Sequence, residues 1–355
     1  MSPRILAVVL GIELTATALF AASSEKTLDV YWMDVEGGAS TLIVTPEGGS
    51  ILIDAGNPGE RDAGRIHHVA AEVAGLKKID TLFVTHFHSD HVGGVVELAK
   101  LMPIGVLYDR GIPEHTPDSL ADEAQFNRLM TPYREMKVDQ RAVIEPGWEL
   151  QRRRATDSMV PSLSLRCLAV GQQFTKTSVD ASTNDICGES KPRSADATDN
   201  INSVVLMLAF GPFHMYLGGD LSWNLEAKLV CPSNLVGHVD VYQADHHGFN
   251  DASNPVLVHT LDPTVAVISN GPQKGGQADI FKTLQSTPDF RAVYEIHRNL
   301  QRGNPTNAPD EYIANLTATN DGNYIKLSVA PDGKNYTVSI PANGHKRTYQ
   351  TKLAN

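Results

Sequence analysis

The sequence predicts a mixed α/β fold built from two similar halves. Short runs of apolar and β-branched residues, bounded by turn residues, alternate with helix-like stretches, which is typical of α/β proteins. The order of a β-hairpin, a helix and a strand that ends in polar residues occurs twice along the chain. We therefore expect two βαβ halves laid face to face, with the ends of both sets of strands meeting at one edge.

The first half is expected to begin with a strand over residues 27–35 and a hairpin over residues 39–57 that turns at the sequence PEGG. A helix then covers about residues 60–75, and a buried strand covers residues 79–86. This strand leads directly into polar residues, so the chemistry of the first half is expected at its end.

The second half repeats this plan with a hairpin over residues 202–222, a helix over residues 221–230 and a strand over residues 239–248. Four polar positions correspond between the halves, namely Ser40, Asp54, Asp80 and His86 in the first and Ser203, Asp220, Asp240 and His246 in the second. Polar groups from both halves should therefore converge at the shared edge.

The segment between the halves is expected to be mixed, with a helix near residues 118–136 and strands near residues 142–150 and 163–170. Residues from about 172 to 200 are rich in Ser, Asp and Thr and almost lack apolar side chains, which predicts a long exposed loop. We interpret this loop as an insertion in a main domain that covers residues 24–310.

The tail over residues 311–355 is expected to be a C-terminal β extension. Its apolar and polar residues alternate, and Asp-Gly pairs at residues 321–322 and 332–333 mark two turns. This pattern predicts a small β-meander.

An export signal is predicted over residues 1–23. Arg4 precedes an apolar stretch over residues 5–20, and three small residues follow it. A membrane anchor or a buried N-terminal helix is the alternative, but Glu13 interrupts the stretch and argues against a span of about 20 apolar residues. We expect an exported protein, periplasmic or secreted, without a stable membrane span once the signal is removed.

The overall composition is that of a soluble globular protein, with 41% hydrophobic and 20% charged residues. Thirty Lys and Arg against 41 Asp and Glu give a net charge of -11, so the average field of the protein repels polyanions. Nucleic acid is therefore an unfavoured partner, and a small-molecule or ester substrate is expected instead. The oligomeric state is left open by the sequence.

Three cysteines, Cys167, Cys187 and Cys231, are too few for a disulfide scaffold and lack the CxxC spacing of a zinc site. In an exported protein, Cys167 and Cys187 could form a disulfide across the polar loop and leave Cys231 unpaired. Three buried thiols are the alternative, and the spacing does not decide between the two.

The residues with the clearest chemistry lie in the sequence HFHSDH, which places His86, His88, Asp90 and His91 within six positions. Alternate residues of a strand share a face, and a sharp turn at the two following glycines can bring the other two side chains round to meet them. Imidazoles and carboxylates are ligands of Zn, Fe and Mn. The cluster therefore predicts a metal site.

Two neighbouring metal ions need a bridging ligand, and a carboxylate from another element can supply it. Asp220, at the end of an apolar strand in the sequence YLGGD, is the expected bridge, with helix capping as its alternative role. A further ligand should come from His246 or His247, of which His247 is favoured because Gly248 follows it. Asp54 ends a buried strand and is expected to orient a ligand histidine or the turn of the cluster.

These residues give the chain a resemblance to a known family. The HxHxDH signature, Asp54, the GGD sequence before residue 221 and the HHG sequence at residues 246–248 resemble, in order, the motifs of the metallo-β-lactamase superfamily, over about residues 27–272. The sequences INSVVLMLAFGPFHMYLGGDLS, VDVYQADHHGF and DPTVAVISNG are similar to one branch of it, which contains the ComEC-like hydrolase domains and bacterial phosphorylcholine esterase.

The resemblance implies an αβ/βα four-layer sandwich with two divalent metal ions at its edge, zinc in the first place and iron or manganese otherwise. It implies that His86 and His88 hold one ion, that Asp90 and His91 hold the second, and that Asp220 bridges them. Many members supply a third histidine before the hairpin of the bridging aspartate, where this chain has DNINS. The first ion is then expected either to have only His86, His88, Asp220 and water, or to be approached by Asn202 or Asp199.

The expected reaction is hydrolysis by a metal-activated water, with Asp90 as the catalytic residue that accepts a hydrogen bond from the attacking oxygen. Phosphoesters are the first expected substrates because of the branch resemblance. Acyl compounds such as lactones, thioesters or β-lactams come second, and a metal-binding module without catalysis is the alternative outside the enzymes. The residues that would hold a particular substrate are not evident from the sequence.

Overall fold

The structure of the protein is a computed structural model that describes residues 26–118, 122–152, 161–176, 183–303 and 306–352. The predicted export signal over residues 1–23 lies outside these ranges. Within them, no helix has both the length and the apolar character that a membrane span needs.

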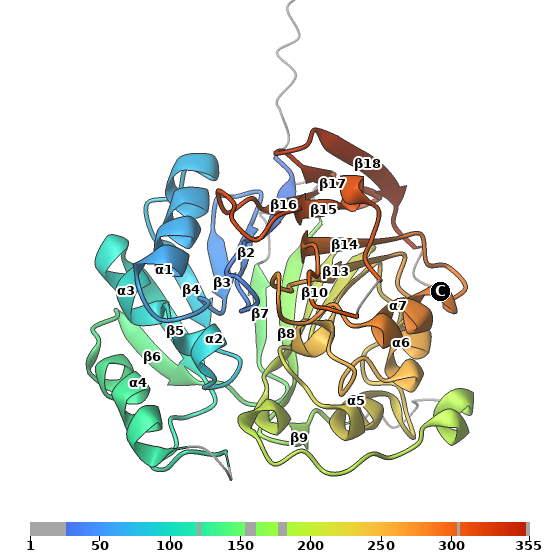
Figure 1. The fold of residues 1–355 in the computed structure, drawn as a ribbon, viewed down its shortest axis with the longest axis horizontal. Helices are drawn as coiled ribbons and strands as arrows, with labels where there is room; N and C mark the ends of the chain where they lie inside the picture. The colour runs from blue at the N-terminus through green and yellow to red at the C-terminus, as the bar shows by residue number, and fades with distance from the viewer. Residues whose placement is uncertain (1–25, 119–121, 153–160, 177–182, 304–305, 353–355) are drawn as a thin grey trace, which may run out of the picture.

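The chain forms two large sheets that pack face to face (Figure 1). In the described part of the chain the first sheet has nine strands, in the order β18-β17-β16-β1-β2-β3-β4-β5-β6. Its strands are β1 (Leu28–Trp32), β2 (Thr41–Val44), β3 (Ser50–Ile53), β4 (Ile79–Phe83), β5 (Ile104–Asp109), β6 (Gln140–Val143), β16 (Ile325–Val329), β17 (Asn335–Ile340) and β18 (His345–Gln350).

The second sheet follows the order β15-β14-β13-β12-β11-β10-β8-β7, with β9 paired to β8. Its strands are β7 (Glu149–Arg152), β8 (Leu163–Val170), β9 (Gln173–Phe174), β10 (Val205–Phe210), β11 (Phe213–Leu217), β12 (Val241–Gln243), β13 (Val265–Ile268), β14 (Ala292–His297) and β15 (Ile313–Asn315). The run from β11 to β15 is parallel.

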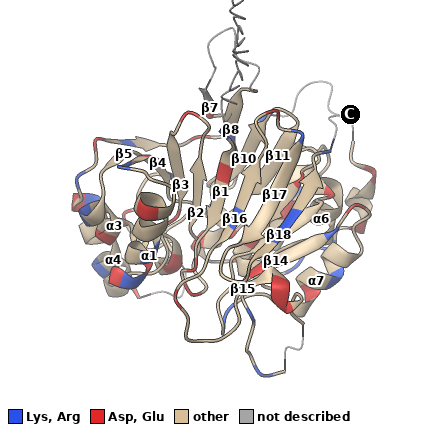
Figure 2. Cartoon of the chain, turned by 90° about the horizontal axis from the view of Figure 1, so that it is seen from above, with Lys and Arg blue, Asp and Glu red and all other residues tan. Residues whose placement is uncertain are grey.

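Helices cover the outer face of each sheet. The first sheet carries α1 (Glu60–His67), which continues as a π-helical turn (His68–Val73), with α2 (Ser89–Val92), α3 (Val95–Leu101) and α4 (Glu123–Glu135); the second carries α5 (Trp223–Val230), α6 (Pro255–Leu261) and α7 (Ala278–Gln285). Figure 2 shows α1, α3 and α4 on one outer side and α6 and α7 on the other, with acidic and basic residues on both sides and mostly uncharged strands between them. The predicted αβ/βα four-layer sandwich is confirmed.

The core between the two sheets is mainly apolar, with a few polar contacts across it. Side chains from both sheets, among them Ile53, Phe83 and Leu208, are fully or almost fully buried there. Trp32 of the first sheet donates from Nε1 to Oε1 of Gln243 in the second, at 2.8 Å. Burial of such side chains removes apolar surface from water, which is the main force that joins the two halves. The buried indole N–H still needs this acceptor.

The predicted hairpins agree with the structure, but three strands end earlier than expected. The strand predicted over residues 27–35 ends at Trp32. The strand predicted over residues 79–86 ends at Phe83, and the strand predicted over residues 239–248 ends at Gln243. The polar residues that follow leave the pleated geometry because their backbones turn to form the edge of the sandwich. The chemistry therefore lies on connecting segments beyond the strands.

The C-terminal tail is a meander, as predicted, but it is part of the main sheet. β16 pairs antiparallel with β1, so the tail extends the first sheet and shares its core. β15, from the start of the tail, pairs with β14 in the second sheet. Backbone hydrogen bonds with both halves thus join the tail to the sandwich.

The predicted pairing of Cys167 with Cys187 is wrong, and so is the alternative of three thiols. Cys187 forms a disulfide with Cys231, and Cys167 is a buried free thiol in the middle of β8. Cys167 faces the core between the sheets, whereas the polar loop folds back over the end of α5. There, Asn184 donates from Nδ2 to the carbonyl of Val230 at 3.0 Å, which brings the two bonded cysteines together.

Candidate metal centre

The predicted ligand residues meet at the edge where β4, β11 and β12 end. His86 follows β4 by three residues, and Asp90 and His91 lie in α2, which begins at Ser89. Asp220 follows β11, and His247 follows β12. Because β3 runs parallel to β4 and β11 runs parallel to β12, each half directs its strand ends to the same edge of its sheet.

One group of donor atoms consists of His86, His88 and Asp220, which offer atoms that all lie within 4.8 Å of one another. Nε2 of His86 lies 3.0 Å from Nδ1 of His88 and 3.9 Å from Oδ2 of Asp220. His86 and Asp220 are almost inaccessible to solvent, whereas His88 is partly exposed. Solvent can therefore reach this donor group from the side of His88.

A second group consists of Asp90, His91, Asp220 and His247. Oδ2 of Asp220 lies 3.2 Å from Nε2 of His91 and 3.3 Å from Nε2 of His247. Nε2 of His247 also lies 3.1 Å from Oδ2 of Asp90. The same oxygen of Asp220 therefore faces both groups.

Hydrogen bonds on the far side of two rings indicate which nitrogen atoms are free to bind a cation. Nδ1 of His91 lies 2.7 Å from a carboxylate oxygen of Asp54, and Nδ1 of His247 lies 2.9 Å from the carbonyl oxygen of Ser269. Both partners only accept, so each ring carries a hydrogen on Nδ1. In the neutral form that binds a cation, the lone pair of Nε2 points into the centre. Without a cation, burial lowers the pKa of His91, but the neighbouring carboxylates outweigh this and hold the pKa well above its usual value, so the ring carries a positive charge.

These lone pairs meet other acceptors. The Nε2 atoms of His91 and His247 are 3.3 Å apart and face the oxygens of Asp90 and Asp220. Four acceptors directed at one another need protons or a cation between them. Nitrogen and oxygen donors of this kind suit Zn, Fe or Mn, so the residues fit a metal centre.

The electrostatics of the centre keep both carboxylates ionised. Burial raises the pKa of Asp220, but the charges of His247, His91 and His246 outweigh this and hold the pKa well below its usual value. Burial likewise raises the pKa of Asp90, and His91, His247 and Lys274 lower it further than burial raises it. An ionised carboxylate is the form that binds a metal ion.

Asp54 supports His91 from behind, the geometry expected from the sequence. Its backbone has a positive φ of 59°, and its side chain is buried. Besides the contact to His91, it accepts from the backbone N–H of Thr85 at 2.8 Å and from the Thr85 hydroxyl at 2.7 Å. These hydrogen bonds hold the chain that leads from β4 to the cluster.

His246 and His247 are not on a strand, although the strand was expected to extend to residue 248. Both have positive φ, 47° and 53°, in a turn that begins at Asp245. This turn brings His247 into the second donor group and leaves His246 outside it. Nε2 of His246 is 3.9 Å from Asp220, and its Nδ1 lies 2.8 Å from Asp251.

Asn202 lies behind the centre and is not among the grouped donors. It donates to Asp199 at 2.9 Å, and the other oxygen of Asp199 accepts from the backbone N–H of Phe87 at 2.7 Å. Asp199 also forms an ion pair with Arg110. Asp199 thus holds the backbone between His86 and His88 through its hydrogen bond to Phe87, and Asn202 holds Asp199 in place.

Two residues that the sequence did not indicate also contact the ligand residues. Asp118 lies 3.1 Å from Nε2 of His88, and Lys274 forms an ion pair with Oδ2 of Asp90. Lys274 lies in a glycine-rich turn, and a Cβ at Gly275 would be 2.2 Å from the carbonyl oxygen of His247. A lysine among glycines after an apolar strand is a sequence pattern that could have identified Lys274 as a site residue. No comparable pattern marks Asp118.

A third set of possible donors, Asp34, Glu36 and His297, shares no residue with the first two groups. Nη1 of Arg65 is 2.9 Å from Asp34 and 3.4 Å from Glu36, and Nε2 of His297 is 2.7 Å from Asp34. A guanidinium already neutralises these carboxylates, so the set is a buried ion-pair network.

Parts of the chain are similar to known proteins. The family model described as the metallo-beta-lactamase superfamily matches residues 33–158. A metal-dependent hydrolase of Koribacter versatilis is 37% identical over 76 residues, which are 21% of this chain and 28% of the relative. One of Cupriavidus taiwanensis is 33% identical over 105 residues, or 28% of this chain and 34% of the relative. The chain thus spans about a third or less of these curated relatives.

Solved structures with similarity include a metallo-beta-lactamase from Cronobacter sakazakii, with 17% identity, coverage of 60% of this chain and 75% of that one, and a TM-score of 0.35. CmlA, a diiron beta-hydroxylase from Streptomyces venezuelae, is 13% identical to this chain. The similarity covers 76% of this chain and 52% of CmlA, with a TM-score of 0.39. The family match contains Asp54 and the whole HFHSDH sequence. Over residues 33–158 the chain is therefore similar to the metallo-beta-lactamase superfamily.

Proposed function

We propose that this protein is a hydrolase that requires two divalent cations and cleaves phosphoester bonds. The observation that carries the proposal is the position of Asp220, whose Oδ2 faces both groups of donor atoms. A carboxylate shared between two such groups is the usual bridge of a two-metal site. The matched curated relatives are named metal-dependent hydrolases, which supports the same class of activity.

Each donor group would hold one cation, namely His86 and His88 for the first and Asp90, His91 and His247 for the second, with Asp220 between them. Bound there, zinc, iron or manganese would supply Lewis acidity and lower the pKa of a water molecule toward neutrality. His246 remains a proposed outer contact, since it lies farther from Asp220 than His247 does.

Two side chains would act on the reacting groups. The Asp90 carboxylate is partly accessible, so it can accept a hydrogen bond from the attacking water and orient it. The Lys274 ammonium contacts the same carboxylate and is 35% exposed, so it can also donate to a negatively charged oxygen of the substrate. A cation in this place favours substrates with an anionic reacting group.

This cation supports phosphoesters as the first substrate class, together with the similarity to the phosphorylcholine esterase branch. Acyl compounds such as lactones, thioesters or β-lactams are the second proposal, because the same donors can serve acyl transfer. The disulfide between Cys187 and Cys231 supports the proposed export, since disulfides persist in oxidising compartments.

The test is a metal count by elemental mass spectrometry, paired with hydrolysis of bis(p-nitrophenyl) phosphate by the same samples. We expect about two ions per chain, one for each donor group. Asp220→Ala should lose both, and Asp90→Asn should lower kcat at least about a hundredfold, as loss of a positioned acid or base does.

Asp279→Asn is the matched control, because Asp279 is an exposed aspartate on α7. It should leave both the metal count and kcat unchanged. Two bound ions without turnover on either ester class would favour the metal-binding module. Less than about half an ion per chain, unaltered by Asp220→Ala, would contradict the two-metal centre.

A further inference from the structure

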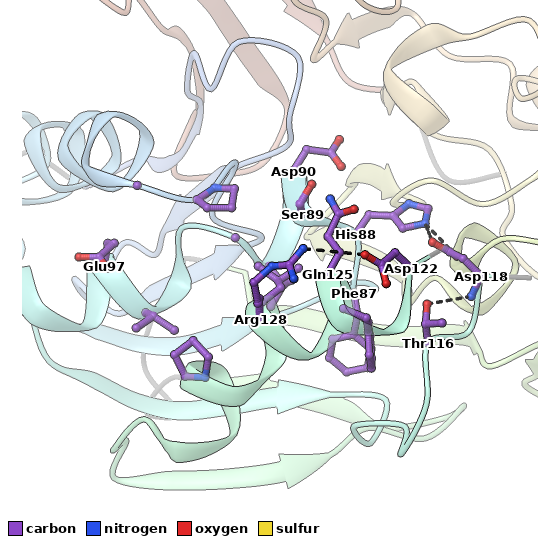
Figure 3. Close-up of a pocket in the computed structure, with 18 of the residues that line it drawn as sticks. Phe87, His88, Ser89, Asp90, Glu97, Thr116, Asp118, Asp122, Gln125 and Arg128 are labelled. Carbon is purple, nitrogen blue, oxygen red and sulfur yellow. Dashed lines mark hydrogen bonds and ion pairs between the residues drawn. The ribbon is translucent and has the colours of Figure 1, made fainter. Parts of the chain in front are cut away.

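A cavity of about 580 Å³ lies beside the metal centre, between α2, α3 and α4 (Figure 3). This volume lies within the range of about 300–1,000 Å³ that small-molecule sites occupy. His88 and Asp90 both line it, and they belong to different donor groups of the centre. One end of a molecule in the cavity would therefore contact a residue of each of the two donor groups.

The wall nearest the centre is polar and held in place. Asp118 contacts Nε2 of His88 at 3.1 Å, and the Asp118 carboxylate also accepts from the backbone N–H of Asp199 at 2.6 Å. Figure 3 shows His88 turned toward Asp118, with Asp90 and Ser89 on the neighbouring turn. These two contacts fix the orientation of the Asp118 side chain in this wall.

Deeper in, the lining is apolar. Phe87, Val96, Phe126 and Leu129 contribute side chains from the cluster turn and from α3 and α4. Phe87 and Phe126 are buried, whereas Val96 and Leu129 remain partly accessible. Accessible apolar side chains in a concave site gain free energy when an apolar group covers them.

The charges around the cavity do not favour an anion. Nζ of Lys100 lies 2.7 Å and 2.8 Å from the two oxygens of Glu97, and Nη2 of Arg128 lies 3.9 Å from Asp122. Both cations are therefore paired with carboxylates of the same rim. The Asp118 and Asp90 carboxylates also line the cavity, so acidic groups exceed basic ones and a second anionic group of a ligand would be repelled.

We propose that this cavity binds an uncharged apolar group of the substrate, an alkyl chain or an aromatic ring, next to the scissile ester bond. The inference rests on the proposed function and specifies its substrate class. The ester itself lies between His88, Asp90 and Lys274, and the apolar substituent extends along Val96 and Leu129 between α3 and α4.

The experiment uses alkyl p-nitrophenyl phosphodiesters whose alkyl group grows from methyl to octyl, with release of p-nitrophenol as the readout. If the chain enters the cavity, kcat/KM should rise about threefold to fourfold for each added methylene until the cavity is full. Leu129→Ala removes apolar lining. It should lower kcat/KM of the octyl ester by about tenfold and that of the methyl ester by less than about twofold.

Leu101→Ala is the matched control, because Leu101 ends α3, is 48% exposed and does not line the cavity. It should leave the whole series unchanged. Turnover that is independent of alkyl length, or a dependence that Leu129→Ala leaves intact, would overturn the cavity assignment while the hydrolase proposal stands. Absence of bound metal and of turnover on every ester would overturn both.

Discussion

The contact between Asp54 and His91 gives the sharpest test of how the metal centre is built. One oxygen of Asp54 lies 2.7 Å from both Nδ1 of His91 and the Thr85 hydroxyl, and the other accepts from the Thr85 backbone at 2.8 Å. In Asp54→Asn, an amide NH₂ must replace one of these oxygens. If it replaces Oδ1, it faces the backbone N–H of Thr85, another donor. If it replaces Oδ2, two donors face each other at His91 unless its ring moves its hydrogen to Nε2, the atom directed at the cation.

We expect Asp54→Asn to weaken metal binding by about 10- to 100-fold, the usual effect of losing a carboxylate behind a ligand histidine. This range corresponds to about 1.4–2.7 kcal/mol. The affinity is measured by competition with a chromophoric chelator for the metal-free protein. The unfolding midpoint of the metal-free protein is measured in parallel, because it reports lost hydrogen bonds without the cation.

Asp62→Asn is the matched control. Asp62 is also a buried aspartate, and it accepts from the backbone N–H of Asn57 at 2.7 Å, but it contacts none of the grouped donors. Its substitution should lower stability and leave metal affinity unchanged. Equal metal affinities in Asp54→Asn and the unmodified protein, within about twofold, would refute the positioning role.

Three further predictions concern a catalytic cation, a buried acid and the disulfide. In steady-state kinetics, Lys274→Ala should raise KM for phosphodiesters by about tenfold, and Lys274→Arg should recover part of this loss. An unchanged KM would show that Lys274 does not contact the substrate. Burial raises the pKa of Glu295 from 4.5 to about 8, so the native state holds the proton more tightly and the free energy of unfolding should fall as pH rises from about 4.5 to about 8. Urea titrations should show a flatter profile in Glu295→Gln, and an unaltered profile would contradict this. Cys187→Ser should lower stability by about 4 kcal/mol, because the disulfide closes a loop of 44 residues, and a loss below about 1 kcal/mol would show that the loop is ordered without it.

Much of the candidate metal centre was visible in the sequence because several of its possible ligands are close together in the chain. HFHSDH places four donors within one turn, so their proximity does not depend on the rest of the fold. Asp54 and Asp220 were found because each ends an apolar strand, and strand ends of an α/β sandwich lie at a common edge. The two hairpins followed from local turn residues and alternation.

Other features depended on contacts between distant segments. Lys274 reaches Asp90 across 184 residues, and Asp118 reaches His88 across 30. The partner of Cys187 was decided by how the polar loop folds over α5, and the choice between His246 and His247 by a turn with positive φ at both. No local pattern specifies such approaches.

The sequence by itself thus determined the class of fold, the first candidate ligands and the two-half plan, since these depend on periodicity and short spacing. The tertiary structure alone decided that the tail joins the first sheet, which carbonyl and carboxylate groups orient the histidines, and that an apolar cavity adjoins the centre. The physical reason is that packing and pairing between distant segments are collective. The position of each depends on the burial and hydrogen bonding of the whole sandwich.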